Sequence, residues 1–145
     1  MPSPYTFLIV DDNPDSRFLL VKTLLRKFPQ AVLEETREGE SALTLARSKT
    51  FDAMVIHRAA EIDGLTLVNM LRQISPTVPI VMVSGLDRTH SAIEAGATTF
   101  LSYEAWLRIG TVVAELITPK SEPPTRVDAP NVARATTPAK VERFS

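Results

Sequence analysis

The sequence predicts an α/β domain with a doubly wound parallel sheet, in which helices cover both faces. The hydrophobic pattern of residues 1–117 changes repeatedly between short continuous apolar runs and segments with a 3.6-residue period. This is typical of alternating strands and helices. Three of the expected strands are apolar at nearly every position, as parallel strands are when both faces of their sheet are covered. The sheet is therefore expected to be internal.

Strands and helices can be placed in order along this region. The apolar runs that predict strands lie at residues 5–10, 31–35, 53–57, 79–84 and 98–101. The first helix is expected to begin at Pro14, because Asp12 or Asn13 can cap it and proline suits the first helical position. The later helices are expected at residues 39–49, 64–74, 87–95 and 104–117.

The first helix has an apolar stripe that is expected to face the core. Its members repeat at three- and four-residue spacing, which places them on one side of a helix. They are Phe18, Val21, Leu25 and Phe28.

The ends of the strands are the places where we expect chemistry. In an open α/β sheet the functional crevice lies outside the carboxyl ends of the strands. The polar residues there are Asp11, Asp12, His57, Ser84, Ser102 and Tyr103. Two interpretations of the adjacent pair Asp11 and Asp12 stay open. The carboxylates can stabilise the start of the first helix, or they can form a weak divalent cation site.

Composition separates residues 1–117 from residues 118–145. The second segment contains five of the eleven prolines, no glycine and only isolated apolar residues. It buries too little surface to offset the entropy of ordering, so we expect a disordered tail after a single domain.

Charge and composition also exclude several classes of protein. The formal net charge of −1, without a run of Lys or Arg, argues against nucleic acid binding. The absence of cysteine excludes disulfides and thiolate metal sites. No apolar run is long enough to span a membrane, and the N-terminus lacks a secretory signal pattern. We expect a cytoplasmic protein.

Four segments in order resemble the receiver domain of bacterial two-component response regulators. "FLIVDDNPDSRFLL" is similar to the opening strand, acidic pair and first helix, and "FDAMVIH" followed by "DGLTLV" to the phosphoacceptor strand and its turn. "PIVMVSG" is similar to the strand that ends in the switch residue, and "EAGATTFLSYEA" to the fifth strand. The resemblance covers about residues 5–117. It implies a flavodoxin-like (βα)5 sandwich with strand order 2-1-3-4-5 and a place in phosphorelay signalling.

The departures from the family pattern fall on the residues that react. The phosphoacceptor aspartate of the family is His57 here, and the lysine that contacts the phosphoryl oxygens is Tyr103. Ser84 keeps the switch position, whereas the turn between His57 and Gly64 is one residue shorter than usual. The chain is therefore expected to be a degenerate receiver, or pseudo-receiver, that is not an enzyme and is not phosphorylated on aspartate.

His57 leaves more than one interpretation open. Its imidazole can be a polar cap that is hydrogen-bonded to the acidic pair, or it can join Asp11 and Asp12 in a set suited to zinc, manganese or iron. We favour the structural role, because the shortened turn is expected to displace the loop beside the pocket. The alternatives are a conventional phosphorylatable receiver with an unrecognised acceptor and a small metal-dependent hydrolase that uses Asp11, Asp12 and His57.

The resemblance also implies a docking face and a protein partner. Receivers generally dock through the fourth helix, fifth strand and fifth helix, which in this chain present Tyr103, Glu104, Trp106 and Arg108. Aromatic residues and arginine dominate interface energies. An equally favoured alternative is that Trp106 packs inward against the sheet and does not contribute to the docking face. The expected partner is a sensor kinase or another signalling protein, and a homodimer is a further possibility. We expect either no cofactor or weakly bound magnesium.

Overall fold

The computed structural model describes residues 4–117, which form a five-stranded parallel sheet in the order β2-β1-β3-β4-β5. The strands are β1 Thr6–Asp11, β2 Val32–Thr36, β3 Ala53–Arg58, β4 Ile80–Ser84 and β5 Thr99–Ser102. The helices are α1 Pro14–Lys27, α2 Gly39–Ser48, α3 Gly64–Ile74, α4 Thr89–Ala95, the 3-10 segment η1 Tyr103–Arg108 and α5 Ile109–Leu116. The predicted flavodoxin-like arrangement and its strand order are confirmed.

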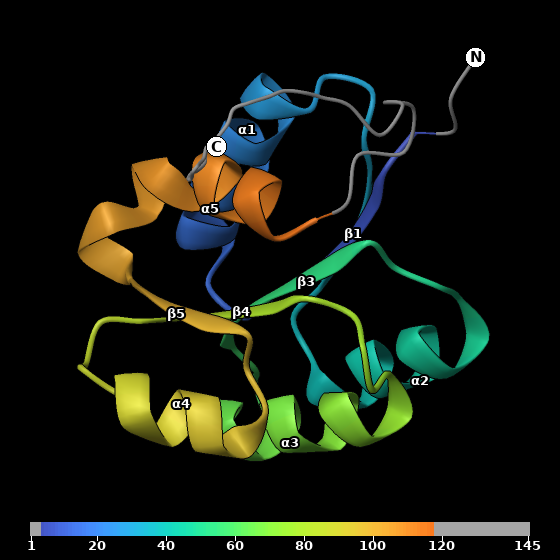
Figure 1. Ribbon diagram of the computed structural model, residues 1–145, viewed down its shortest axis with the longest axis vertical. Helices are drawn as coiled ribbons and strands as arrows, with labels where there is room; N and C mark the ends of the chain where they lie inside the picture. The colour runs from blue at the N-terminus through green and yellow to red at the C-terminus, as the bar shows by residue number, and fades with distance from the viewer. Residues whose placement is uncertain (1–3, 118–145) are drawn as a thin grey trace, which may run out of the picture.

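Helices cover both faces of the sheet. Figure 1 shows α1 and α5 on one face and α2, α3 and α4 on the other. Leu8 and Met54 pack in the cluster under α2 and α3, whereas Phe7 and Val55 pack in the cluster under α1 and α5. Successive strand residues point to opposite faces. Because both faces are covered, the central strands are apolar at almost every position, as the sequence predicts.

The pairing of the strands brings the candidate residues to one edge of the sheet. The register between β1 and β3 shifts before Asp11, which lies opposite Arg58. As a result β3 extends one residue beyond the predicted strand at 53–57. β4 and β5 end at the same edge, where Ser84 pairs with Ser102.

The structure corrects the predicted apolar stripe on α1. Phe18 is 59% exposed, and the ammonium of Lys22 lies 5.8 Å from the centre of its ring. Ser16 is buried instead, because its hydroxyl donates a hydrogen bond to the buried carboxylate of Asp11. Residues two apart lie about 200° apart around a helix, so turning Ser16 inward turns Phe18 outward. The buried residues of α1 are Ser16, Leu20, Thr23 and Leu24.

The helix predicted at 104–117 is two segments. The 3-10 segment η1 contains a kink at Ala105, where φ is −101° and ψ is 26°, before α5 begins at Ile109. The kink lets Tyr103 and Trp106 turn toward the cluster under α1 and α5.

The described residues fall within the predicted domain of residues 1–117, and the predicted tail at 118–145 lies outside them. Across residues 4–117 no helix is long and apolar enough to cross the bilayer.

Candidate functional site

Asp11 is fully buried at the end of β1 and lies at the centre of a hydrogen-bonded cluster. Its Oδ1 accepts a hydrogen bond from the backbone amide of Asn13 at 3.0 Å, and its Oδ2 accepts one from the hydroxyl of Ser16. The Nδ1 atom of His57 lies 3.0 Å from the same Oδ2, and the imidazole donates when Nδ1 carries the proton. A buried carboxylate requires such partners. The three donors therefore fix Asp11 in place.

These contacts also set the charge of Asp11. Burial removes water from the carboxylate and opposes its ionisation, but the hydrogen bonds from His57, Ser16 and the Asn13 amide outweigh it and hold the pKa of Asp11 below its ordinary value. Asp11 is therefore an anion at neutral pH whose oxygens already have donors from the same chain. In addition, Nη1 of Arg17 donates to the backbone oxygen of Asp11 at 2.7 Å, which ties α1 to the end of β1.

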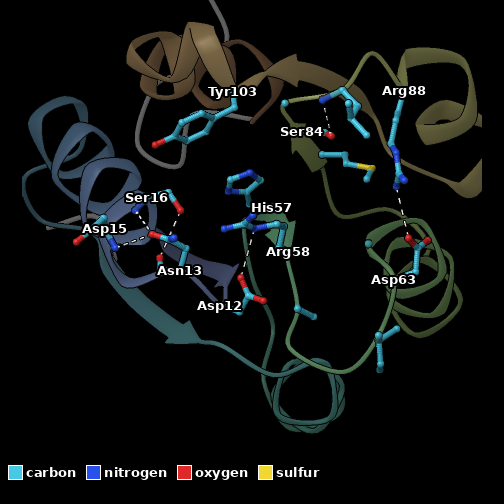
Figure 2. A pocket seen from close by; sticks show the side chains of 16 residues that line it. Asp12, Asn13, Asp15, Ser16, His57, Arg58, Asp63, Ser84, Arg88 and Tyr103 are labelled. Carbon is cyan, nitrogen blue, oxygen red and sulfur yellow. Dashed lines mark hydrogen bonds and ion pairs between the residues drawn. The ribbon is translucent and has the colours of Figure 1, made fainter.

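His57 is buried between the sheet edge and an aromatic ring. It is the second-last residue of β3 and only 8% exposed. Tyr103, at the start of η1, stacks on the imidazole with ring centroids 4.9 Å apart and planes inclined by 8°. Figure 2 shows the two rings one above the other in the pocket. His57 and Tyr103, which come from separate elements, are thus in direct contact through their rings.

Asp12 lies at the rim of the pocket and pairs with Arg58. Nε of Arg58 lies 3.3 Å from Oδ1 of Asp12, as Figure 2 shows, and the backbone amide of Asp12 donates to the backbone oxygen of Arg58 at 3.0 Å. Of the two expected caps of α1 the structure selects Asn13, whose Oδ1 accepts from the amides of Asp15 and Ser16. Asp12 is therefore an ion-pair partner and not the cap.

An open cavity of about 740 Å³ lies at this edge of the sheet, with Asp12, His57 and Tyr103 in its lining. Ser84 also lines it, and its hydroxyl oxygen accepts a hydrogen bond from the amide of Leu86 at 3.1 Å. This is the local backbone contact that a hydroxyl at a strand end commonly makes.

The loop between β3 and α3 is fastened to the start of α2. The carboxylate of Glu61 accepts hydrogen bonds from the amides of Gly39 at 2.8 Å and Glu40 at 2.9 Å, and these bonds lower the pKa of Glu61. A Cβ at Gly39 would lie 2.5 Å from Cδ1 of Ile62, so a larger residue there would push aside the end of the Ile62 side chain. The loop between β3 and α3 is therefore held against the start of α2.

Of the six polar residues predicted at the strand ends, the structure brings three into contact and leaves two separately in the cavity lining. The sixth, Ser102, is exposed at the end of β5. Asp11, His57 and Tyr103 form one contact chain, whereas Asp12 and Ser84 line the cavity separately.

Three residues of the site were not predicted from the sequence: Ser16, Arg58 and Glu61. For Arg58 a signal exists in the sequence, because it follows His57 directly at the end of the strand. The contacts of Ser16 and Glu61 join separate elements, and no local pattern indicates them.

The carboxylates of Asp11 and Asp12 already have partners within the chain that a divalent ion would have to displace. Both oxygens of Asp11 have hydrogen-bond partners, and Nδ1 of His57 faces Asp11. Oδ1 of Asp12 faces the guanidinium of Arg58. Magnesium is usually held in proteins by one or two carboxylates and keeps several water ligands, so it would compete with these partners for the same oxygens. Within residues 4–117 no group of three or more His, Cys, Asp or Glu residues is arranged to hold a metal.

Two of the four predicted docking residues pack against the core. Tyr103 and Trp106 are half-buried against the cluster under α1 and α5. Glu104 and Arg108 are exposed, and Leu107 between them is 63% exposed. The aromatic part of the predicted face therefore points inward, and its charged part points outward.

Residues 7–104 match the family model of the response regulator receiver domain. The response regulator protein PilR of Pseudomonas aeruginosa is 35% identical over 99 residues, which cover 66% of this chain and 22% of PilR. The chain thus spans about a fifth of the length of this curated relative.

Solved structures of response regulators share the fold. A putative response regulator from Chloroflexus aurantiacus is 27% identical with a TM-score of 0.66, over 77% of this chain and 99% of that one. A response regulator from Burkholderia pseudomallei, solved with a phosphorylated aspartic acid, a calcium ion and citrate, is 23% identical with a TM-score of 0.61. That match covers 77% of this chain and 72% of the Burkholderia chain.

Proposed function

The chain belongs to the response regulator receiver domain family of two-component signalling, and from this premise we propose that it is a degenerate receiver. It works in the cytoplasm through protein contacts, catalyses no reaction and is not phosphorylated on aspartate. The observation that supports this proposal is His57, which stands where the acceptor is expected and is enclosed by Asp11 on one side and Tyr103 on the other.

The chemistry of phosphoryl transfer explains why this arrangement is unsuited to it. A receiver needs a carboxylate that attacks phosphorus, a metal ion that neutralises the phosphoryl oxygens and a fixed positive charge beside them. Here the carboxylate is replaced by an imidazole, and the phenol of Tyr103 carries no positive charge. The ring of Tyr103 also covers His57, so an approaching phosphate meets an aromatic face.

Neither Asp52 nor Asp63 is placed to act as a substitute acceptor. Asp52 accepts a hydrogen bond from the amide of Thr6 at 2.8 Å, at the opposite edge of the sheet from His57. Asp63 caps α3 and accepts from the amide of Leu65 at 3.0 Å. A hydrolase built on Asp11, Asp12 and His57 is likewise unsupported, because Asp12 is paired with an arginine.

Intact-mass measurement tests the absence of phosphotransfer. The purified chain is incubated with acetyl phosphate and magnesium. The Burkholderia pseudomallei response regulator, which was solved with a phosphorylated aspartic acid, is treated in parallel as the reactive control. We expect a phosphoryl adduct on the control and none on this chain. An acid-labile adduct on this chain, mapped to any aspartate, would contradict the proposal.

The proposed partner is a sensor kinase or another signalling protein that contacts the exposed part of η1. Glu104, Leu107 and Arg108 are exposed there, so one apolar and two opposite charged side chains are presented together. Reversing both charges with Glu104→Lys and Arg108→Glu is expected to reduce recovery of the partner in a pull-down from the native cell. Arg47→Glu, on the exposed side of α2, is the matched control and should leave recovery unchanged.

A further inference from the structure

Arg58 is placed beside the acidic pair by the backbone of β3. The strand continues one residue beyond His57, and the register shift sets Arg58 opposite Asp11. The backbone oxygen of Arg58 accepts from the amide of Asp12 at 3.0 Å. Its side chain turns back to the same residue, with Nε 3.3 Å from Oδ1 of Asp12. Both the backbone and the side chain of Arg58 therefore bind Asp12.

The chain after Arg58 is fixed as well. The amide of Ala60 donates to the backbone oxygen of Arg37 at 2.9 Å, and Glu61 is bound to the start of α2 through two amides. Arg58 thus lies between two anchored segments, the strand before it and the loop after it. Its position beside Asp12 follows from these contacts and not from the ion pair alone.

Each carboxylate of the acidic pair consequently has its own partner within the chain. Asp11 is bound by His57, Ser16 and the Asn13 amide, and Asp12 by Arg58. We infer that Arg58 takes the electrostatic place of a divalent ion at this acidic pair and holds Asp12 and the start of α1 to β3 without metal. This inference stands on the contacts of Arg58 and holds whether or not the chain accepts phosphate.

Arg58 changes the charge around Asp12 more than it changes the stability of the fold. The side chain of Arg58 is 55% exposed and that of Asp12 is 30% exposed, and an exposed ion pair contributes little to stability. A guanidinium, however, keeps its charge at every physiological pH. A divalent ion that approaches Asp12 is therefore repelled by the guanidinium of Arg58. To bind the carboxylate of Asp12, the ion must displace this guanidinium.

Paramagnetic broadening by Mn²⁺ measures this effect directly. Amide spectra of the chain are recorded during a titration with MnCl₂, for the wild type and for Arg58→Gln, which keeps a polar side chain and removes its charge. We expect Arg58→Gln to show broadening at Asp12 and Asn13 at Mn²⁺ concentrations about tenfold lower than the wild type. Adding Asp12→Asn to Arg58→Gln should remove this gain.

Two further variants separate charge from other effects. Arg58→Lys retains the positive charge and should behave as the wild type does. Arg88→Gln removes the other arginine of the cavity, which pairs with Asp63 at 3.5 Å, and should also leave the titration unchanged. The inference is overturned if wild type and Arg58→Gln broaden at the same Mn²⁺ concentration. It is equally overturned if Arg88→Gln gains Mn²⁺ binding as Arg58→Gln does, because the effect would then be general to the cavity.

Discussion

Replacing His57 by aspartate and by asparagine separates the charge of position 57 from its shape. Both side chains are shorter than histidine, and both place an atom close to the position of Nδ1, which lies 3.0 Å from Oδ2 of Asp11. Asparagine can donate a hydrogen bond to Asp11, whereas an ionised aspartate cannot. The two variants also lose the stack on Tyr103 equally.

The difference in stability between the variants can be estimated from these contacts. Loss of an aromatic stack costs about 0.5–1.5 kcal/mol, and this cost is common to both. In His57→Asp a second carboxylate faces the buried anion of Asp11, and such pairs raise one pKa by roughly 2 units, which is about 3 kcal/mol at neutral pH. We therefore expect His57→Asp to be less stable than His57→Asn by about 3 kcal/mol, a large share of the 5–15 kcal/mol typical of domains.

Urea unfolding between pH 3 and pH 8, without added metal, measures this difference. The raised pKa belongs to the folded state. The two variants should therefore be equally stable below the ordinary carboxyl pKa of about 4, and His57→Asp should lose stability as the pH rises through the raised value. Equal stability of the two variants at every pH would refute the reasoning, because it would mean that Asp11 is not a buried anion beside position 57.

Three further predictions concern the contacts around this cluster. Ser16→Ala removes one donor to Asp11 and should lower the free energy of unfolding by about 1.5–3 kcal/mol at pH 7. Because the folded-state pKa of Asp11 is lowered, unfolding measurements should show this loss shrinking as the pH falls through that pKa. His57→Asp should label only slowly from acetyl phosphate and magnesium, and adding Tyr103→Lys should speed the labelling, since a well-placed positive charge contributes on the order of 2–4 kcal/mol to such transition states; rapid and complete labelling of the single variant would show an intact phosphorylation pocket. Glu61→Gln leaves one acceptor oxygen in place of two and so removes one of the two hydrogen bonds to the start of α2. Hydrogen exchange of those amides should become faster, whereas unchanged exchange would show that the loop does not depend on the carboxylate.

The sequence predicted the fold because its signals are local and repeated. Continuous apolar runs mark strands buried on both faces, and Pro14 after two candidate caps marks the start of α1. Prediction failed at Phe18, where helical spacing alone suggested burial. The rotation of α1 is decided by the contact of Ser16 with Asp11, which joins two elements and leaves no periodic trace in the sequence.

The site was predictable in position but not in its contacts. That Asp11, His57 and Tyr103 meet at one edge follows from the rule for parallel sheets, and the structure places them in contact. The pairing of Asp12 with Arg58 depends on a register shift between β1 and β3. The inward turn of Tyr103 depends on the short 3-10 segment η1. Both contacts depend on backbone geometry that cannot be read from residue types and spacing alone.

The central claim is that this receiver fold does not respond to a phosphoryl group, and beryllium fluoride with magnesium tests it most directly. The complex of beryllium with fluoride mimics a phosphoryl group on an aspartate, so amide spectra before and after its addition report any switching. With His57 enclosed between Asp11 and Tyr103, we expect the spectrum to remain almost unchanged. Shifts spread across Ser84, Tyr103 and the neighbouring residues of β4 and η1 would contradict the account.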